Sequence, residues 1–224
     1  MAIVKLVTGY IDIPNHPRGA YDYRVLGEKL LAAIDGYEAL VFDGPEQTVA
    51  QTWMAQALKG MPNITRSVAD NPEKNTLPYH CVQHQKFGWL SAAKMLDTED
   101  PAQMYVWIDY GIMHVPGVNQ DVIQKYLARV SDYGGAVTMP GCWPKGEVPH
   151  DRPCWRFCGG LMAVPSPLVK IFTRSAMGVA MRQISATRNV EWEVNTLARL
   201  EALDEVPMTW YKADHDQTMF SAAP

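Results

Sequence analysis

Apolar residues follow two patterns along this chain: short continuous runs, and longer stretches in which they recur every three or four positions. The short runs are rich in β-branched and aromatic residues and predict strands, whereas the periodic stretches predict helices. We expect strands over 3–8, 38–42, 63–68, 104–108, 134–139, 155–164 and 208–212, and helices over 24–34, 47–58, 79–96, 121–131, 167–187 and 190–203. Because strands alternate with helices, the pattern predicts an α/β fold in three layers around a mostly parallel sheet.

The second half of the chain is less regular than the first. The Gly, Pro and Trp-rich stretch 140–153 predicts a long excursion from the core, and the part around Trp143 is a candidate lid that excludes water from a site. Gly159 and Gly160 interrupt the strand predicted over 155–164, at a point where another group approaches the backbone closely.

The composition is that of a folded, soluble enzyme. Of the 224 residues, 47% are hydrophobic and 20% are charged, which argues against disorder, and one domain of this length buries a sizeable core. Lys5 interrupts the apolar stretch 2–7, so that this stretch predicts a strand and not a leader peptide. No run approaches the roughly 18 apolar residues of a membrane helix. We therefore expect a single-domain cytoplasmic protein with no transmembrane segment.

The charge is unevenly distributed. The net charge of −4 gives no overall attraction to nucleic acid, yet no acidic residue lies between Arg152 and Val190. Four basic residues of this stretch fall within about a third of a helical circumference. They predict either a solvated helix face or a face that contacts a polyanion: Lys170, Arg174, Arg182 and Arg188.

The cysteines raise the question of a zinc site. Cys142, His150, Cys154 and Cys158 are of the residue types that bind zinc, but their spacing does not match the paired ligands of a zinc knuckle. We therefore expect ordinary thiols, kept reduced in the cytoplasm.

One carboxylate follows the most apolar run of the chain. The run 104–108 ends abruptly at Asp109, and Tyr110 and Gly111 come next. A buried strand that ends in this way delivers a carboxylate to the sheet edge at which ligands of α/β proteins gather. The alternative is that Asp109 only caps a turn or the next helix.

Several motifs together resemble a known family. They are 7–12 (VTGYID), 106–111 (VWIDYG), 157–160 (FCGG) and 191–195 (EWEVN), followed by His215 near the end. In order and spacing they resemble the bacterial HtrL/YibB-like glycosyltransferases, over nearly the whole chain. The resemblance implies a single-domain, Rossmann-like GT-A fold, with a nucleotide-sugar half over about 1–112 and an acceptor half over about 113–224.

The resemblance also implies a reaction. A sugar would pass from a nucleotide sugar, UDP-linked, to a hydroxyl of an acceptor, and lipopolysaccharide biosynthesis is the family's suggested setting. Because the leaving diphosphate gains negative charge, such enzymes use Mn²⁺ or Mg²⁺ held by oxygen ligands and sometimes one imidazole. The family's Asp-x-Asp motif is incomplete here, since Gly111 stands at the second place. Asp109 and His215 are the expected metal ligands, and Asp214 or Asp216 could replace His215.

By resemblance, the donor would lie on the loop after the first strand and on the mid-chain motif. A glycine there lets the ligand approach the backbone, Arg18 would contact phosphate, Tyr23 would stack on the base, and Lys86 would meet the donor unless it is a plain surface lysine. The expected donor-binding residues are Thr8, Gly9, Asp12, Arg18, Tyr23, Lys86, Asp109 and Gly111.

The acceptor side would be formed by the second half of the chain. Glu191 and Glu193 open a helix, where the helix dipole favours carboxylates in any case. In related folds this helix start faces the acceptor, so that Glu193 or Glu191 would be the catalytic base of an inverting reaction, or would orient the donor in a retaining one. Together with Asp109 they form the expected catalytic set, and the expected acceptor-binding residues are Gly159, Gly160, Trp192 and Asn195.

Two other functions fit the same residues. The acceptor of a phage-type DNA glycosyltransferase is a hydroxymethylated base, which must be flipped out of the duplex, and the basic stretch would suit such modified DNA. A chain that lost its second metal carboxylate could instead be a non-catalytic nucleotide-sugar-binding protein. A dehydrogenase is disfavoured, since no Gly-x-Gly-x-x-Gly follows the first strand. The sequence leaves open whether the protein is a homo-oligomer.

Overall fold

The computed structural model describes residues 4–17, 19–66, 72, 74–97 and 104–224. Its main sheet has six strands, in the order β2 (Glu38–Phe42), β1 (Val4–Gly9), β4 (Met104–Ile108), β6 (Leu161–Pro165), β5 (Val137–Gly141) and β8 (Met208–Lys212). Three of the five strand pairs are parallel, and β6 runs antiparallel to both of its neighbours. The prediction of a mostly parallel mixed sheet is therefore confirmed.

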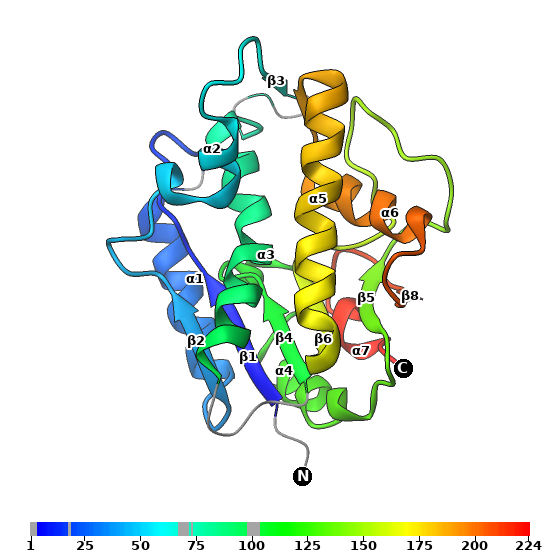
Figure 1. Ribbon diagram of the computed structural model, residues 1–224. Helices are drawn as coiled ribbons and strands as arrows, with labels where there is room; N and C mark the ends of the chain where they lie inside the picture. Colours follow the sequence, from blue (N-terminus) through cyan, green and yellow to red (C-terminus); the bar gives the residue numbers. More distant parts are fainter. Residues whose placement is uncertain (1–3, 18, 67–71, 73, 98–103) are drawn as a thin grey trace.

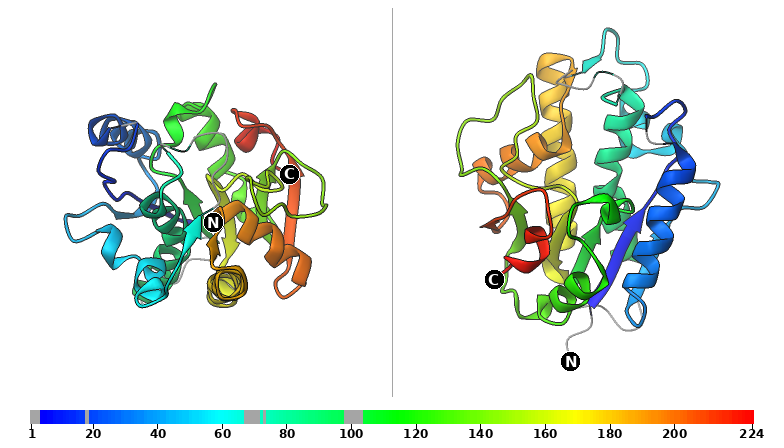
Figure 2. Two further views of the ribbon diagram at one scale, coloured as in Figure 1. Left: turned by 90° about the horizontal axis from the view of Figure 1, so that it is seen from above. Right: turned by 180° about the vertical axis from the view of Figure 1, so that it is seen from behind.

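Helices cover both faces of this sheet (Figures 1 and 2). One face carries α3 (Leu77–Leu96), α5 (Val169–Thr187) and α6 (Glu193–Leu203), and the other carries α1 (Ala20–Ala33), α4 (Gln120–Leu127) and α7 (Thr218–Ser221). Seen from above, the yellow α5 and the red α7 lie on opposite sides of the strands (Figure 2, left). This is the three-layer α/β arrangement predicted from the alternation of elements.

Strand β4 shows why its sequence reads as a continuous apolar run. Alternate side chains of a strand point to opposite faces, and both faces of β4 are covered. Val106 and Ile108 belong to the core under α1 and α4, whereas Tyr105 and Trp107 belong to the core under α3 and α5. All five residues of the strand are buried, so that a polar side chain first becomes available at Asp109.

Some element boundaries differ from the predictions. The strand predicted over 155–164 begins only at Leu161 and ends at Pro165, because the preceding segment is bonded to the end of β5 instead, through Trp155 O and Cys158 N. The strand predicted over 134–139 begins later and reaches Gly141, so it takes in the first residues of the predicted excursion. The helix predicted over 190–203 begins at Glu193.

Two short segments lie outside the main sheet. The region predicted as a strand over 63–68 contributes β3 (Thr65–Arg66), which pairs with β7 (Asn189–Val190) in a separate two-stranded ribbon, and 67–68 fall outside the described residues. The helix predicted over 47–58 is divided into a 3-10 turn (Val49–Gln51) and α2 (Trp53–Leu58). Thr52 separates them, since its side chain accepts a hydrogen bond from Ala55 N and caps α2.

Within the described part of the chain, no helix combines the length and the apolar character needed to cross a bilayer.

Candidate functional site

A cavity of about 360 Å³ opens at the carboxyl ends of β1 and β4. Its walls come from the loop after β1, helix α3, the turn after β4, the segment 153–160, the start of α6 and the loop after β8. Most of the residues predicted for the site line it: Gly9, Asp12, Tyr23, Lys86, Asp109, Gly111, Gly159, Gly160, Trp192, Glu193 and His215. The predicted donor and acceptor residues therefore share one cavity.

Asp109 lies at the end of β4, and one of its two carboxylate oxygens is engaged by the protein. Oδ1 accepts hydrogen bonds from Trp107 Nε1 at 2.7 Å and from Lys86 Nζ at 3.4 Å. The backbone N–H of Asp109 donates to Gly160 O at 2.9 Å, which fixes the turn. Its side chain is 35% exposed, and no hydrogen bond from the described residues occupies Oδ2. That oxygen is therefore available to a ligand or a cation.

Lys86 is the buried cation of the site. It projects from α3 with only 1% of its surface exposed, and its Nζ donates to Gly159 O at 2.8 Å and to Glu193 Oε1 at 3.2 Å as well as to Asp109. The same Nζ lies 5.6 Å from the ring centre of Trp107. One ammonium group thus connects the end of β4, the segment before β6 and the start of α6.

The electrostatics of this cluster favour the charged forms of Lys86 and Glu193. Burial by itself would lower the pKa of Lys86, but the carboxylates of Asp109 and Glu193 outweigh burial and raise it. Burial would raise the pKa of Glu193, but Lys86 and His84 outweigh burial and lower it. The carboxylate of Glu193 is therefore ionised and paired, so its basicity is reduced while Lys86 stays beside it.

Gly159 lies at a point where another group approaches the backbone closely, as predicted from the sequence, and that group is the ion pair of Glu193 and Lys86. A Cβ at this position would lie 2.4 Å from Glu193 Oε1 and 3.2 Å from Lys86 Nζ. The space that a side chain would take at Gly159 is thus occupied by the ion pair. At Gly160 a Cβ would meet Asp109 Oδ2 at 3.4 Å, so the absence of a side chain there keeps that oxygen accessible.

Aromatic side chains form two groups on the cavity wall. Tyr10 stacks on Tyr110, with ring centres 5.4 Å apart, and also lies 5.6 Å from Tyr23. On the other side, Tyr79 stacks on His16 and meets the edge of Trp192. Of these rings, only Tyr23 and Trp192 were predicted as site residues. Tyr10 and Tyr110 lie within the motifs 7–12 and 106–111. Their place in these motifs is the sequence signal that could have identified them as site residues.

Three predicted site residues lie outside the cavity wall. Thr8 is buried in β1, and its hydroxyl has no hydrogen-bond partner among the described residues. Glu191 is buried in an ion cluster, where it accepts hydrogen bonds from Arg199 Nε at 3.0 Å and Gln183 Nε2 at 2.7 Å. Asn195 is fully buried and holds the long loop by its side-chain amide. Arg18 lies outside the described residues.

The long loop of the second half is anchored to α6. Asn195 Nδ2 donates to Pro149 O at 2.8 Å and Arg152 O at 2.9 Å, and its Oδ1 accepts from Cys154 N at 2.7 Å. His150 Nδ1 lies 2.8 Å from Glu191 Oε1. These contacts explain why Glu191 and Asn195 belong to the 191–195 motif although neither lines the cavity. Trp143, the centre of the predicted lid, is 39% exposed and does not line the cavity.

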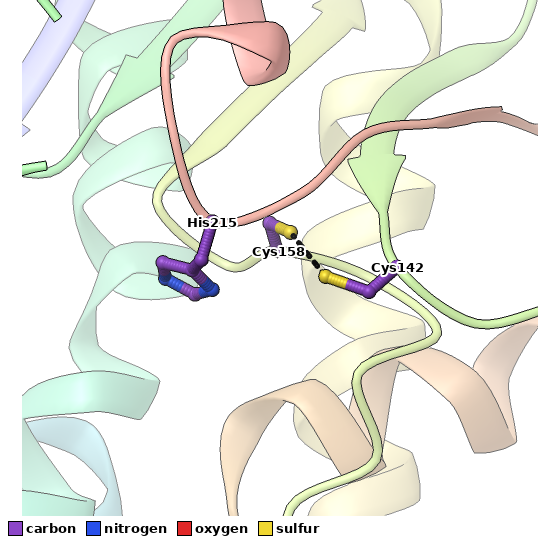
Figure 3. A group of neighbouring side chains, drawn as sticks. All are labelled: Cys142, Cys158 and His215. Atoms are coloured by element: carbon purple, nitrogen blue, oxygen red, sulfur yellow. Dashed lines mark hydrogen bonds between the residues drawn. The ribbon is translucent and has the colours of Figure 1, made fainter. Parts of the chain in front are cut away.

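His215 lies on the cavity wall beside two thiols (Figure 3). Its ring meets the edge of Trp155 at 4.9 Å, and partial desolvation of this otherwise exposed side chain lowers its pKa, which favours the neutral imidazole that binds a cation. The Sγ atoms of Cys142 and Cys158 are 3.8 Å apart. All four cysteines are free thiols, as predicted. The four zinc-type residues considered from the sequence are not assembled, because His150 binds Glu191 instead.

The basic residues of α5 are remote from this site. Lys170, Arg174 and Arg182 are exposed and do not line the cavity. Arg182 is paired with Glu205 at 3.3 Å. These exposed side chains fit the solvated helix face, and contact with a polyanion stays a prediction that the structure does not test.

No protein-family model matches the chain, and no curated protein matches it. Among solved structures, the chain is similar to a glycosyltransferase involved in the glycosylation of the major capsid of PBCV-1, with a TM-score of 0.54 and 13% identity, covering 95% of this chain and 81% of that one. It also matches the bifunctional IspDF of Campylobacter jejuni and the 4-diphosphocytidyl-2C-methyl-D-erythritol synthase of Anaerococcus prevotii. Each match has a TM-score of 0.43, 7% identity and 95% coverage of this chain, with 50% and 90% of the other chain covered respectively.

The first of these similarities defines the class of fold. The chain has a glycosyltransferase-type α/β fold, with a six-stranded mixed sheet between two layers of helices. At 13% identity the likeness concerns the fold alone, and the two matches at a TM-score of 0.43 carry no argument. The reaction must therefore be argued from the residues of the cavity.

Proposed function

We propose that this protein is a glycosyltransferase that binds a nucleotide sugar in the cavity at the end of β4 and transfers the sugar to a hydroxyl group. The observation that carries the proposal is the buried Lys86, held by Asp109 and Glu193 in the cavity at the end of β4. A preorganised cation at this place stabilises the negative charge that grows on a leaving diphosphate. The glycosyltransferase fold supports the same reaction.

The donor would lie across the first half of the cavity. The stacked pair Tyr10 and Tyr110, with Tyr23 beside it, offers flat surfaces for a nucleotide base. Asp12 lies next to these rings and accepts a hydrogen bond from Tyr10 at 3.2 Å, so its other oxygen is placed for a ribose hydroxyl. We propose a UDP-linked donor, and membership in the HtrL/YibB-like family, on the strength of the motifs alone.

A divalent cation fits this site with a reduced set of protein ligands. Asp109 Oδ2 and the neutral imidazole of His215 both face the cavity, and Mg²⁺ commonly takes one or two carboxylates together with substrate phosphates and water. When bound, Mn²⁺ or Mg²⁺ would neutralise charge on the diphosphate. Lys86 supplies a second, permanent positive charge, which compensates for the missing second carboxylate ligand at Gly111.

Glu193 is the remaining candidate for the catalytic base, because Glu191 is occupied by Arg199 and lies outside the cavity. We propose that Glu193 holds Lys86 in the free protein and becomes a stronger base when Lys86 turns toward the diphosphate of a bound donor. Trp192 and Gly160 would flank the acceptor.

For the acceptor we propose a surface glycan such as lipopolysaccharide, and for the location the cytoplasm. The structural neighbour is involved in glycosylation of a capsid protein, so an acceptor panel should include glycoproteins. The exposed basic residues of α5 lie away from the cavity, and we do not propose DNA as the acceptor.

The test of donor binding is a thermal-shift screen of nucleotide sugars with and without Mn²⁺, since a ligand that binds the folded state raises its melting temperature. We expect one donor to stabilise the protein, more strongly with Mn²⁺. The Asp109→Asn variant should lose the effect of Mn²⁺, whereas Asp121→Asn, an exposed change in the first turn of α4, should keep it. Absence of a response to every donor would contradict the proposal.

A further inference from the structure

The structure brings together three metal-binding side chains that are distant in the sequence. Cys142 follows β5, Cys158 lies just before β6, and His215 lies in the loop after β8. Their ligand atoms all lie within 4.8 Å of one another (Figure 3). Among the described residues, these three side chains form the one group of His, Cys, Asp or Glu that could hold a metal ion.

Backbone hydrogen bonds hold the three residues in this arrangement. Cys142 N donates to Trp155 O at 2.9 Å, and Cys158 N donates to Pro140 O at 2.7 Å. The C-terminal segment is tied to the same strand end, because Ala213 N donates to Gly141 O at 2.9 Å. The positions of the ligands therefore follow from the fold itself and need no bound ion to assemble them.

The separation of the sulfurs matches a tetrahedral metal site. Two sulfurs that each lie about 2.3 Å from Zn²⁺ at the tetrahedral angle are about 3.8 Å apart, and Cys142 Sγ and Cys158 Sγ are 3.8 Å apart. A disulfide would require about 2.05 Å. The pair is thus spaced as two ligands of one ion, and a ring nitrogen of His215 lies within 4.8 Å of both sulfurs.

We propose that Cys142, Cys158 and His215 form a binding site for a soft divalent cation, Zn²⁺, beside the donor cavity. Two thiolates and one imidazole favour Zn²⁺ over Mg²⁺ and Mn²⁺, which prefer oxygen ligands. Cys158 is fully buried, whereas His215 is exposed, so the ion would be reached from the side of His215 and would keep its fourth position for water.

This site shares His215 with the cation site proposed at Asp109, but its other two ligands are thiols. In Figure 3 one ring nitrogen of His215 is on the side of the thiols and the other faces away from them. A zinc ion on the thiol side would fix the orientation of the ring, and the second nitrogen would remain for the cation proposed at Asp109. Zinc would thereby hold together the end of β5, the segment before β6 and the C-terminal loop.

The experiment is a titration of the reduced, metal-free full chain with Co²⁺ and Zn²⁺. Co²⁺ bound to thiolates gives an intense near-ultraviolet charge-transfer band, which Zn²⁺ abolishes by displacing it. We expect one Co²⁺ per chain, and one Zn²⁺ retained per chain after dialysis. Cys142→Ser should weaken binding by roughly a hundredfold or more, because even the loss of a group that only supports a ligand costs 10- to 100-fold.

Matched controls distinguish this site from other thiols and from the Asp109 site. Cys81→Ser and Cys154→Ser remove the other two free thiols and should leave Co²⁺ binding unchanged, and so should Asp109→Asn. A substitution at the fully buried Cys158 would disturb the core, so the test uses the half-buried Cys142. Circular dichroism checks that the Cys142→Ser variant is folded. The proposal would be overturned by the absence of a stoichiometric Co²⁺ band or by equal Co²⁺ binding in Cys142→Ser. It would also be overturned if Cys142 and Cys158 formed a disulfide with each other even under reducing conditions. None of these outcomes depends on sugar transfer.

Discussion

At the scale of single residues, the candidate site is organised by one buried ammonium group. Lys86 has 1% of its surface exposed and contacts two carboxylates and a carbonyl oxygen. A charge in such a place is costly unless every partner is present. Its neighbours Glu193 and Gly159 are therefore tied to it, the first by charge and the second because any side chain at Gly159 would collide with the pair.

Replacement of Lys86 by methionine should destabilise the protein by about 3–5 kcal/mol, because it leaves the buried carboxylate of Glu193 without its counter-charge. Urea unfolding measures the change. The double variant Lys86→Met/Glu193→Gln should recover part of the loss, as coupled neighbours do. Lys94→Met, further along the same helix, is the matched control and should cost much less. Equal losses for Lys86→Met and Lys94→Met would show that the ion pairs of Lys86 contribute no more to the free energy of unfolding than the contacts of Lys94.

His84 predicts a dependence of stability on pH. It is buried, with Nδ1 donating to His80 O at 2.9 Å and Nε2 at 3.1 Å from Thr196 Oγ1. Burial lowers its pKa from the ordinary value of 6.5 to about 4. Between these two values the unfolded chain binds a proton that the folded chain does not. The free energy of unfolding should therefore fall as the pH drops from about 6.5 to about 4. Above pH 7 the titration of His84 should no longer change the free energy of unfolding.

The variant His84→Gln isolates this contribution, because glutamine is neutral at every pH and carries both a donor and an acceptor. From pH 7.5 to pH 4.5 the unmodified protein should lose roughly 2–3 kcal/mol more than the variant. Carboxylates titrate in both proteins and cancel in the comparison. Parallel pH profiles of the two proteins in urea unfolding would mean that His84 is not held neutral by burial.

At the scale of elements, the sequence predicted the strands whose apolar pattern is local. It did not predict segments whose path depends on contacts with residues distant in the sequence. Strand β2 has the predicted boundaries and β4 the predicted apolar run, because their patterns are local. The segment 155–160 was misread as strand, since its path depends on a hydrogen bond between Cys158 and Pro140 that no local pattern reveals. For the same reason the meeting of Cys142 and Cys158 with His215 could not be predicted, whereas Asp109 could be, because it directly follows a strand.

Asn195 of α6 makes three hydrogen bonds to the long loop before β6, beside the ion pair of Arg156 with Glu201. Asn195→Ala should remove three hydrogen bonds and leave the buried N–H of Cys154 unpaired, at a cost of roughly 3 kcal/mol. Trypsin should then cleave the loop faster after Lys145, which is exposed. Asn119→Ala, which removes the N-cap of α4, should cost about 1 kcal/mol and leave cleavage after Lys145 unchanged. Unchanged cleavage in Asn195→Ala would contradict the anchoring role.

At the scale of the whole molecule, the cavity is lined by segments that the fold brings together at one edge of the sheet. Strands β1 and β4 bring the first loop and Asp109, and α3 brings Lys86. The segments before β6 and after β8 close the other side. The motifs 7–12, 106–111, 157–160 and 191–195 are far apart in the sequence yet surround this single place. Their order along the chain allowed the site to be predicted, but the charge pairing within it is visible only in three dimensions.

The most direct test of the central claim is the release of nucleoside diphosphate from nucleotide sugars, measured for the unmodified protein and for Asp109→Asn. With the donor that stabilises the protein, we expect slow release to water and faster release when a glycan acceptor is added. We expect a loss of roughly a hundredfold or more in the variant, as for other groups that stabilise transition-state charge. Binding of a donor with no release under any condition, unchanged by Asp109→Asn, would contradict the account and would identify the protein as a non-catalytic nucleotide-sugar binder.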